Sequence, residues 1–171
     1  QMCIRDSLDT DETLYGGKVV LDYQATDDQL LYARIARGYK SGGVNTDGTL
    51  NKAEREFDTE YQWAYELGSK SSLLDDSLQI RVAAFYNDRQ DMHIKDSIIP
   101  VGGPGAFVDY IVNAAEGSNY GLEIESLWQA TDALQLFANI GSLRTDIDEC
   151  DTAGCINLVG RDQPHAPRYQ Y

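Results

Sequence analysis

The chain has 171 residues, with 28 Asp and Glu against 14 Lys and Arg, and a formal net charge of −14. This acidic balance argues against a nucleic-acid partner, because phosphate binding needs clustered basic side chains. The sequence has no apolar run of about 18 or more residues, so no transmembrane helix is predicted. Membrane β-strands alternate in polarity and are missed by that criterion.

The first residues fit none of the patterns that follow. We expect residues 1–17 to be a non-native, adapter-like leader followed by a partial strand or loop, because the opening QMCIRDS resembles translated adapter sequence. This segment also lacks the apolar stretch of a secretory signal. Residues 18–171 are predicted to form one domain.

From residue 18 onward, apolar and polar side chains alternate, which predicts strands because successive side chains of a strand point to opposite faces. The first two strands are predicted at 18–25 and 29–37, joined by a tight turn at 26–28. A polar, glycine-rich stretch at 38–59 leads to a third strand at 60–73. There Tyr61, Trp63, Tyr65 and Leu67 alternate with Gln62, Glu66, Gly68 and Lys70.

The second half repeats the arrangement. A short turn at 75–76 opens a fourth strand at residue 78, which continues as far as residue 99. Gly102, Gly103, Pro104 and Gly105 lack the Lys and Ser/Thr of a phosphate loop and are interpreted as a hairpin tip. The fifth strand returns from residue 106 to a turn at 131–133. A sixth strand from residue 134, a loop at 146–167 and a final strand fragment complete the chain.

These strands predict an all-β fold, namely an antiparallel transmembrane β-barrel segment. It would be an up-and-down meander of about seven strands from a larger barrel. Every second connection is tight and the others are long, and the third strand exceeds the roughly 5–6 residues usual in soluble proteins. Lipid rather than a protein core would then cover Leu78, Val82, Leu122 and Leu136. A soluble extracellular or periplasmic β-sandwich that binds carbohydrate or protein also alternates in this way and is the alternative.

Tyrosine and tryptophan side chains support the membrane interpretation. Placing the tight turns on the periplasmic side collects aromatic residues at two levels, as expected at the two membrane–water boundaries. The outer level contains Tyr39, Tyr61, Trp63, Tyr86 and Tyr120, and the inner level contains Tyr23 and Trp128.

Several segments resemble the β-barrel region of TonB-dependent outer-membrane receptors. They are YARIARGYKSGGVN at 32–45, YELGSKS at 65–71, AFYND at 84–88 with QDM at 90–92, NAAE at 113–116 with YGLEIE at 120–125, and GRDQPHAPRY at 160–169. Val44 departs from the pattern, since an aromatic residue is usual there. The chain resembles the later-middle part of a barrel of about 22 strands. The family's N-terminal plug, energy-coupling box and closing strand have no counterpart in it.

The resemblance implies a localisation, a function and partners. It implies an outer-membrane receptor that binds a scarce nutrient, most often a ferric siderophore, and imports it with energy from the TonB complex. The implied partners are outer-membrane lipid, the plug domain of the same protein, the TonB complex and the siderophore. A passive porin-type barrel, without a plug, is a further alternative. No cofactor is expected.

Charged residues on the polar side of the strands are the candidate lumen-facing residues. They could contact the plug or line the substrate path, although paired charges on a hydrated barrel wall are the favoured explanation for any one of them. These candidates are Arg34, Glu66, Lys70, Arg81, Arg89, Glu123 and Glu125.

Other chemistry-bearing residues give weaker signals. Cys150 and Cys155 are close in sequence in a predicted outer loop, where a disulfide is expected, whereas Cys3 belongs to the leader. The acidic run Asp146, Asp148, Glu149 and Asp151 lacks the order of a calcium loop and predicts a solvated loop. The two histidines, His93 and His165, are too far apart in sequence to indicate a metal site. No residue pattern recommends an enzyme.

Overall fold

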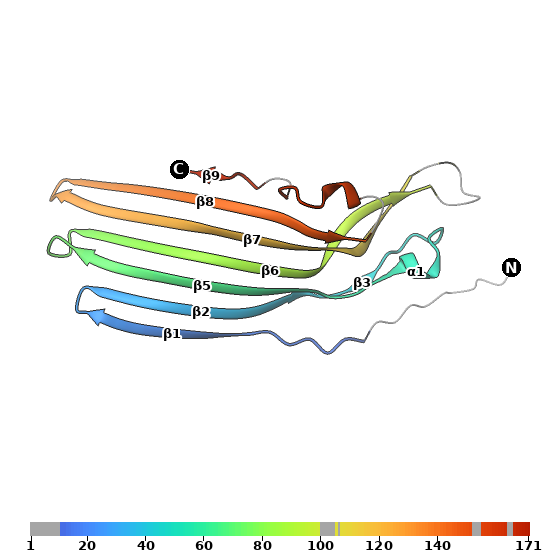
Figure 1. Ribbon diagram of the computed structural model, residues 1–171, viewed down its shortest axis with the longest axis horizontal. Coiled ribbons are helices and arrows are strands. Elements are labelled where there is room, and N and C mark those ends of the chain that lie inside the picture. Colours follow the sequence, from blue (N-terminus) through green and yellow to red (C-terminus); the bar gives the residue numbers. More distant parts are fainter. Residues whose placement is uncertain (1–10, 100–104, 106, 152–154, 164–165) are drawn as a thin grey trace.

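The computed structural model of the chain describes residues 11–99, 105, 107–151, 155–163 and 166–171. Seven antiparallel strands form one sheet in the order β1-β2-β5-β6-β7-β8-β9, and β3 and β4 form a separate two-stranded pair. Figure 1 shows the sheet as a single elongated layer. The strands are β1 Gly17–Thr26, β2 Gln29–Lys40, β3 Gly43–Val44, β4 Glu56–Phe57, β5 Glu60–Leu73, β6 Leu78–Ile98, β7 Val108–Thr131, β8 Leu134–Cys150 and β9 Tyr169–Gln170.

The two ends of the sheet differ. The β1–β2, β5–β6 and β7–β8 connections are tight and lie together at one end, on the left of Figure 1. The other end contains the long connections, which hold β3, β4, the helix α1 Lys52–Arg55 and the 3₁₀ helix η1 Ile156–Leu158. Asn51 caps α1 reciprocally with Glu54, which explains why a four-residue helix forms there. We call these the tight-turn end and the long-loop end.

One face of the sheet is apolar and lies open. Leu122 and Leu136 are 43% and 46% exposed, and no second layer covers them in the part of the chain that the structure describes (Figure 1). A soluble sandwich buries this face between two sheets, so the sandwich alternative is wrong. No helix among the described residues is long and apolar enough to cross a membrane.

A row of aromatic side chains crosses the apolar face. Tyr65, Tyr86 and Tyr120 are direct partners on β5, β6 and β7, and successive ring centroids are 6.4 Å apart. Tyr39 and Tyr61 are paired nearer the long-loop end. These tyrosines form the outer aromatic level that the sequence predicts.

The long-loop end is more ordered than the sequence predicts. β2 continues to Lys40, and the stretch up to residue 59 contains short elements instead of an uninterrupted loop. β8 also runs to Cys150, because its last residues pair with β7 as far as Ala115. The predicted loop from residue 146 therefore begins five residues later.

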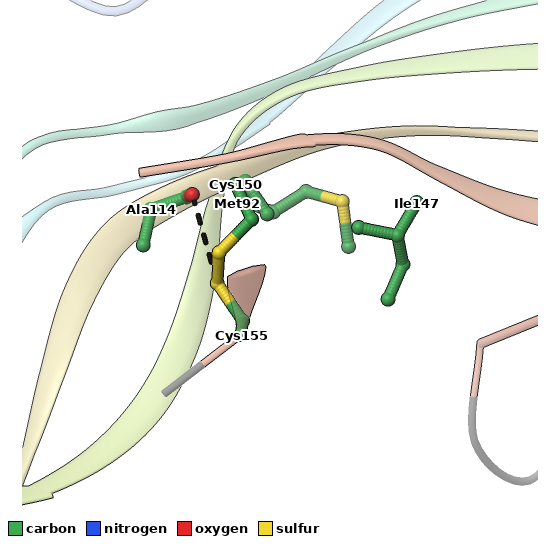
Figure 2. Packing of buried hydrophobic residues seen from close by; sticks show 6 residues of the cluster. Met92, Ala114, Ile147, Cys150 and Cys155 are labelled. Carbon is green, nitrogen blue, oxygen red and sulfur yellow. Dashed lines mark hydrogen bonds between the residues drawn. A yellow bond between two sulfur atoms is a disulfide. The ribbon is translucent and has the colours of Figure 1, made fainter. Parts of the chain in front are cut away.

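A small apolar cluster lies where the last strands bend. Irregular pairing at Arg89–Met92–His93 and at Glu116–Gly117 breaks the regular ladders of β6 and β7 there. The cluster, drawn in Figure 2, is formed by Met92, Ala114, Ala115, Ile147, Cys150 and Cys155. It joins β6, β7 and β8 to the segment before η1.

Candidate functional site

The seven charged candidates lie on the polar face of the sheet, opposite the apolar face. The strand register decides this, because directly paired residues of adjacent strands share a face. Arg34 pairs with Glu66, while Arg81 pairs with Lys70 on one side and Glu125 on the other. Glu123 and Arg89 have the same parity as Glu125 and Arg81 on their strands.

Arg34, Glu66 and Tyr32 form the densest group in the middle of this face. Arg34 Nη2 forms an ion pair with Glu66 Oε2, and the Tyr32 hydroxyl donates to Glu66 Oε1 over 2.8 Å. Both carboxylate oxygens are therefore occupied. The three side chains tie β2 to β5 and leave little freedom for Glu66 to bind anything else.

Two cations face each other closer to the tight-turn end. Lys70 and Arg81 are direct partners, an arrangement that destabilises a sheet when nothing compensates it. The Lys70 ammonium lies 5.5 Å from the Tyr32 ring centroid, and Arg81 Nη1 lies 3.6 Å from Glu125 Oε2. The two cations thus have separate partners, and a double positive charge does not build up.

A buried charge pair lies at the long-loop end. The Glu60 side chain, 9% exposed, forms an ion pair with Arg89, and its other oxygen accepts the His93 backbone N–H over 3.0 Å. Burial raises the pKa of Glu60, but the bonds from His93 and Arg89 outweigh it and bring the pKa below its ordinary value. Arg89 therefore lies nearer the long-loop end than the other six candidates do.

Side chains attach the loop between β2 and β5 to β7. The Asn45 amide donates to the Ile111 carbonyl oxygen (2.8 Å) and accepts from its N–H (2.9 Å). Asn113 repeats this pattern with Asp58, accepting from the N–H over 2.6 Å and donating to the carbonyl oxygen over 2.9 Å. These amides act like strand partners and hold the loop over the end of the sheet.

His93 belongs to the same attachment. Its Nε2 lies 2.7 Å from the Asp58 carbonyl oxygen, and its ring packs edge-on against Phe57 with centroids 5.0 Å apart. His165 lies outside the described residues. His93 therefore has structural partners in the loop.

Cys150 and Cys155 form a disulfide that ties the end of β8 to the segment before η1 (Figure 2). Of the acidic run, the first three residues lie in β8 instead of a loop, and Asp151 directly follows it. The described residues contain no group of acidic, histidine or cysteine side chains that could hold a metal ion. Cys3 and residues 102–104 of the expected hairpin tip lie outside the described residues.

The comparison with known families decides the kind of protein. The family model described as "TonB dependent receptor-like, beta-barrel" matches residues 5–171. The chain belongs to the TonB-dependent receptor family. It is therefore a segment of an outer-membrane β-barrel.

Individual receptors align with most of the segment. The pesticin receptor of Yersinia enterocolitica serotype O:8 / biotype 1B is 30% identical over 153 residues, which are 90% of this chain and 21% of that protein. The metal-pseudopaline receptor CntO of Pseudomonas aeruginosa is 32% identical over 114 residues, 67% of this chain and 14% of that protein. The chain thus spans about a fifth or less of these relatives.

A solved structure shares the fold. The ferric yersiniabactin uptake receptor FyuA from Yersinia pestis superposes with a TM-score of 0.69 at 24% identity, covering 89% of this chain and 21% of that one. The similarity extends over the sheet and supports the barrel architecture. It does not by itself transfer the substrate of that receptor.

Proposed function

We propose that the full-length protein imports a scarce nutrient, a ferric siderophore, across the outer membrane in a TonB-dependent step. The observation that carries this proposal is the sheet itself, with one open apolar face and an opposite face of ion-paired polar residues, in a TonB-dependent receptor segment. Relatives named as receptors for metal-pseudopaline and structures named for ferric yersiniabactin uptake support the choice of a metal chelate.

In this proposal the polar face lines the barrel interior. Arg34 and Glu66 neutralise each other, as do Arg89 and Glu60, so this wall presents few uncompensated charges. Such a wall suits contact with a folded plug domain better than tight capture of a charged ligand. We therefore assign a wall-forming role to these residues and expect the nutrient to be bound elsewhere in the full-length protein. No enzymatic role is proposed.

The test is uptake of radiolabelled iron, supplied as individual purified siderophores, by iron-limited cells with and without the gene. The expected result is loss of uptake of at least one siderophore in the deletion strain and recovery on complementation. Unchanged uptake of every siderophore would refute the proposal that the imported nutrient is a ferric siderophore. Uptake that persists after the proton gradient is collapsed would instead favour the passive porin.

A further inference from the structure

Arg37 is an unusual residue on the apolar face of the sheet. It is the direct partner of Trp63, and it lies two residues beyond the paired Ile35 and Tyr65, toward the long-loop end. At about 3.3 Å per residue it is about 7 Å beyond the tyrosine row. It therefore occupies the lipid-facing side at the level of the outer membrane–water boundary.

Aromatic rings surround the Arg37 guanidinium. Its central carbon lies 4.1 Å from the ring centroids of both Tyr15 and Tyr61, and 5.9 Å from that of Trp63. Its Nη1 also donates to the Tyr15 carbonyl oxygen over 2.6 Å. Stacking of this kind fixes the plane of the guanidinium and leaves its edge groups to hydrogen-bond.

No acidic side chain of the described residues neutralises this cation. Among the described residues Arg37 has no ion pair, although the chain carries twice as many acidic as basic residues. Asp88 lies on the same face at the same height along the strands, because it is the β6 partner of Trp63. Its carboxylate accepts a hydrogen bond from the Gln90 side chain. Since Asp88 is two strands away, about 10 Å, it does not satisfy the guanidinium.

We propose that Arg37, held by Tyr15, Tyr61 and Trp63, binds the phosphate of an anionic lipid headgroup in the outer leaflet. One Nη1–H is used by the Tyr15 carbonyl oxygen, which leaves four of the five guanidinium N–H donors for phosphate oxygens. The location selects lipid as the source of the phosphate, because this face is in contact with the membrane. The aromatic rings would lie against the glycerol and upper acyl region.

The site would fix the receptor's depth in the membrane. A stacked cation at the aromatic level gains an oriented charge-assisted contact, whereas a lysine at the same place would supply only a mobile point charge. Tyr15, 67% exposed, would be partly covered by the bound headgroup. The proposal concerns the outer surface of the barrel and is independent of the nutrient that the receptor imports.

The test uses native mass spectrometry of the full-length receptor in detergent, titrated with phosphatidic acid and, separately, with diacylglycerol of the same acyl chains. The wild-type protein should bind phosphatidic acid more tightly, and Arg37→Gln should weaken that binding about tenfold or more without changing diacylglycerol binding. Arg37→Lys should give an intermediate affinity. Lys40→Gln, three residues away on the polar face, is the matched control and should leave both affinities unchanged.

Three outcomes would overturn the proposal. An unchanged preference for phosphatidic acid in Arg37→Gln would show that the arginine does not bind the phosphate. Equal weakening of both lipids would indicate that Arg37 only maintains the local structure. Displacement of phosphatidic acid by inorganic phosphate at matching concentration would make this a free-anion site.

Discussion

The ring of Tyr32 on β2 lies over Gly68, the residue directly opposite it on β5. A Cβ built on Gly68 would overlap this ring. The ring cannot easily move away, because its hydroxyl is bonded to Glu66 and the Lys70 ammonium lies near its face. Glycine is therefore required at position 68 by its neighbour on the next strand.

Gly68→Ala should destabilise the barrel by about 1–3 kcal/mol, because the added methyl group forces Tyr32 out of its position. The measurement is the free energy of unfolding of the full-length receptor in detergent micelles, from denaturant titration. Gly38→Ala is the control, since a Cβ at that position meets nothing within 4 Å. A similar loss of stability in both variants would contradict the assigned role of Tyr32.

The two faces of β7 should respond differently to a new charge. Ile124 lies among Val82 and Ile140 on the apolar face, so Ile124→Arg should cost about 2–4 kcal/mol if it lies near the bilayer midplane. The adjacent Glu123 faces Ala83 and Gly141 on the polar face, and Glu123→Arg should cost much less. The free energy of unfolding of each variant, refolded into lipid vesicles, measures both costs. Equal costs would mean that the faces are wrongly assigned.

Strand positions were predictable where alternation and turn residues agree. The third predicted strand, at 60–73, coincides with β5, since its aromatic and polar residues alternate cleanly and Asp75 and Asp76 follow as turn formers. The end of β8 was not predictable. Its acidic residues have low strand propensity, and only pairing with β7 keeps them extended as far as Cys150.

The alternation along each strand predicts which residues lie on the polar face. It does not predict which of their side chains bond one another. Glu60 was missed because it begins its strand, and because its bond to Arg89 is diagonal and does not join direct strand partners. One usable signal existed. The tight turn at 75–76 fixes the register of β5 against β6, which places Gln62 opposite Arg89 and Glu60 just beyond it. The amide contacts of Asn45 and Asn113 join distant segments and leave no local pattern.

Removing the disulfide should loosen the outer end without disturbing the sheet below it. The bond closes a loop of about five residues, for which the chain-entropy model gives about 2 kcal/mol. Cys150→Ser with Cys155→Ser should increase hydrogen exchange around η1, as measured by mass spectrometry. Amides of β5 around Tyr65 are the internal control and should be unchanged. Unaltered exchange around η1 would show that the disulfide is not needed to hold this segment in place.

Two carboxylates beyond the aromatic level should give the long-loop end opposite pH responses. The pKa of Glu60 is lowered, so its stabilising bonds are complete above its ordinary pKa of about 4.3 and are lost as the pH falls through the lowered value. Burial raises the pKa of Glu116, as do Glu149, its direct partner on β8, and Asp88. Its ionisation therefore opposes folding, and protonation relieves this repulsion as the pH falls through the raised pKa.

Protection of these outer amides should therefore pass through a maximum as the pH is lowered from neutral. It should rise as Glu116 becomes protonated and fall again once Glu60 loses its charge and its bond to Arg89. Hydrogen exchange of the full-length receptor, corrected for the intrinsic pH dependence of exchange, measures both limbs. Glu116→Gln should remove the rise in protection nearer neutral pH, which is the first limb of the curve. Glu60→Gln should remove the fall at more acidic pH, which is the second limb. If either limb survives its own substitution, the titration belongs to another of the acidic residues at this end.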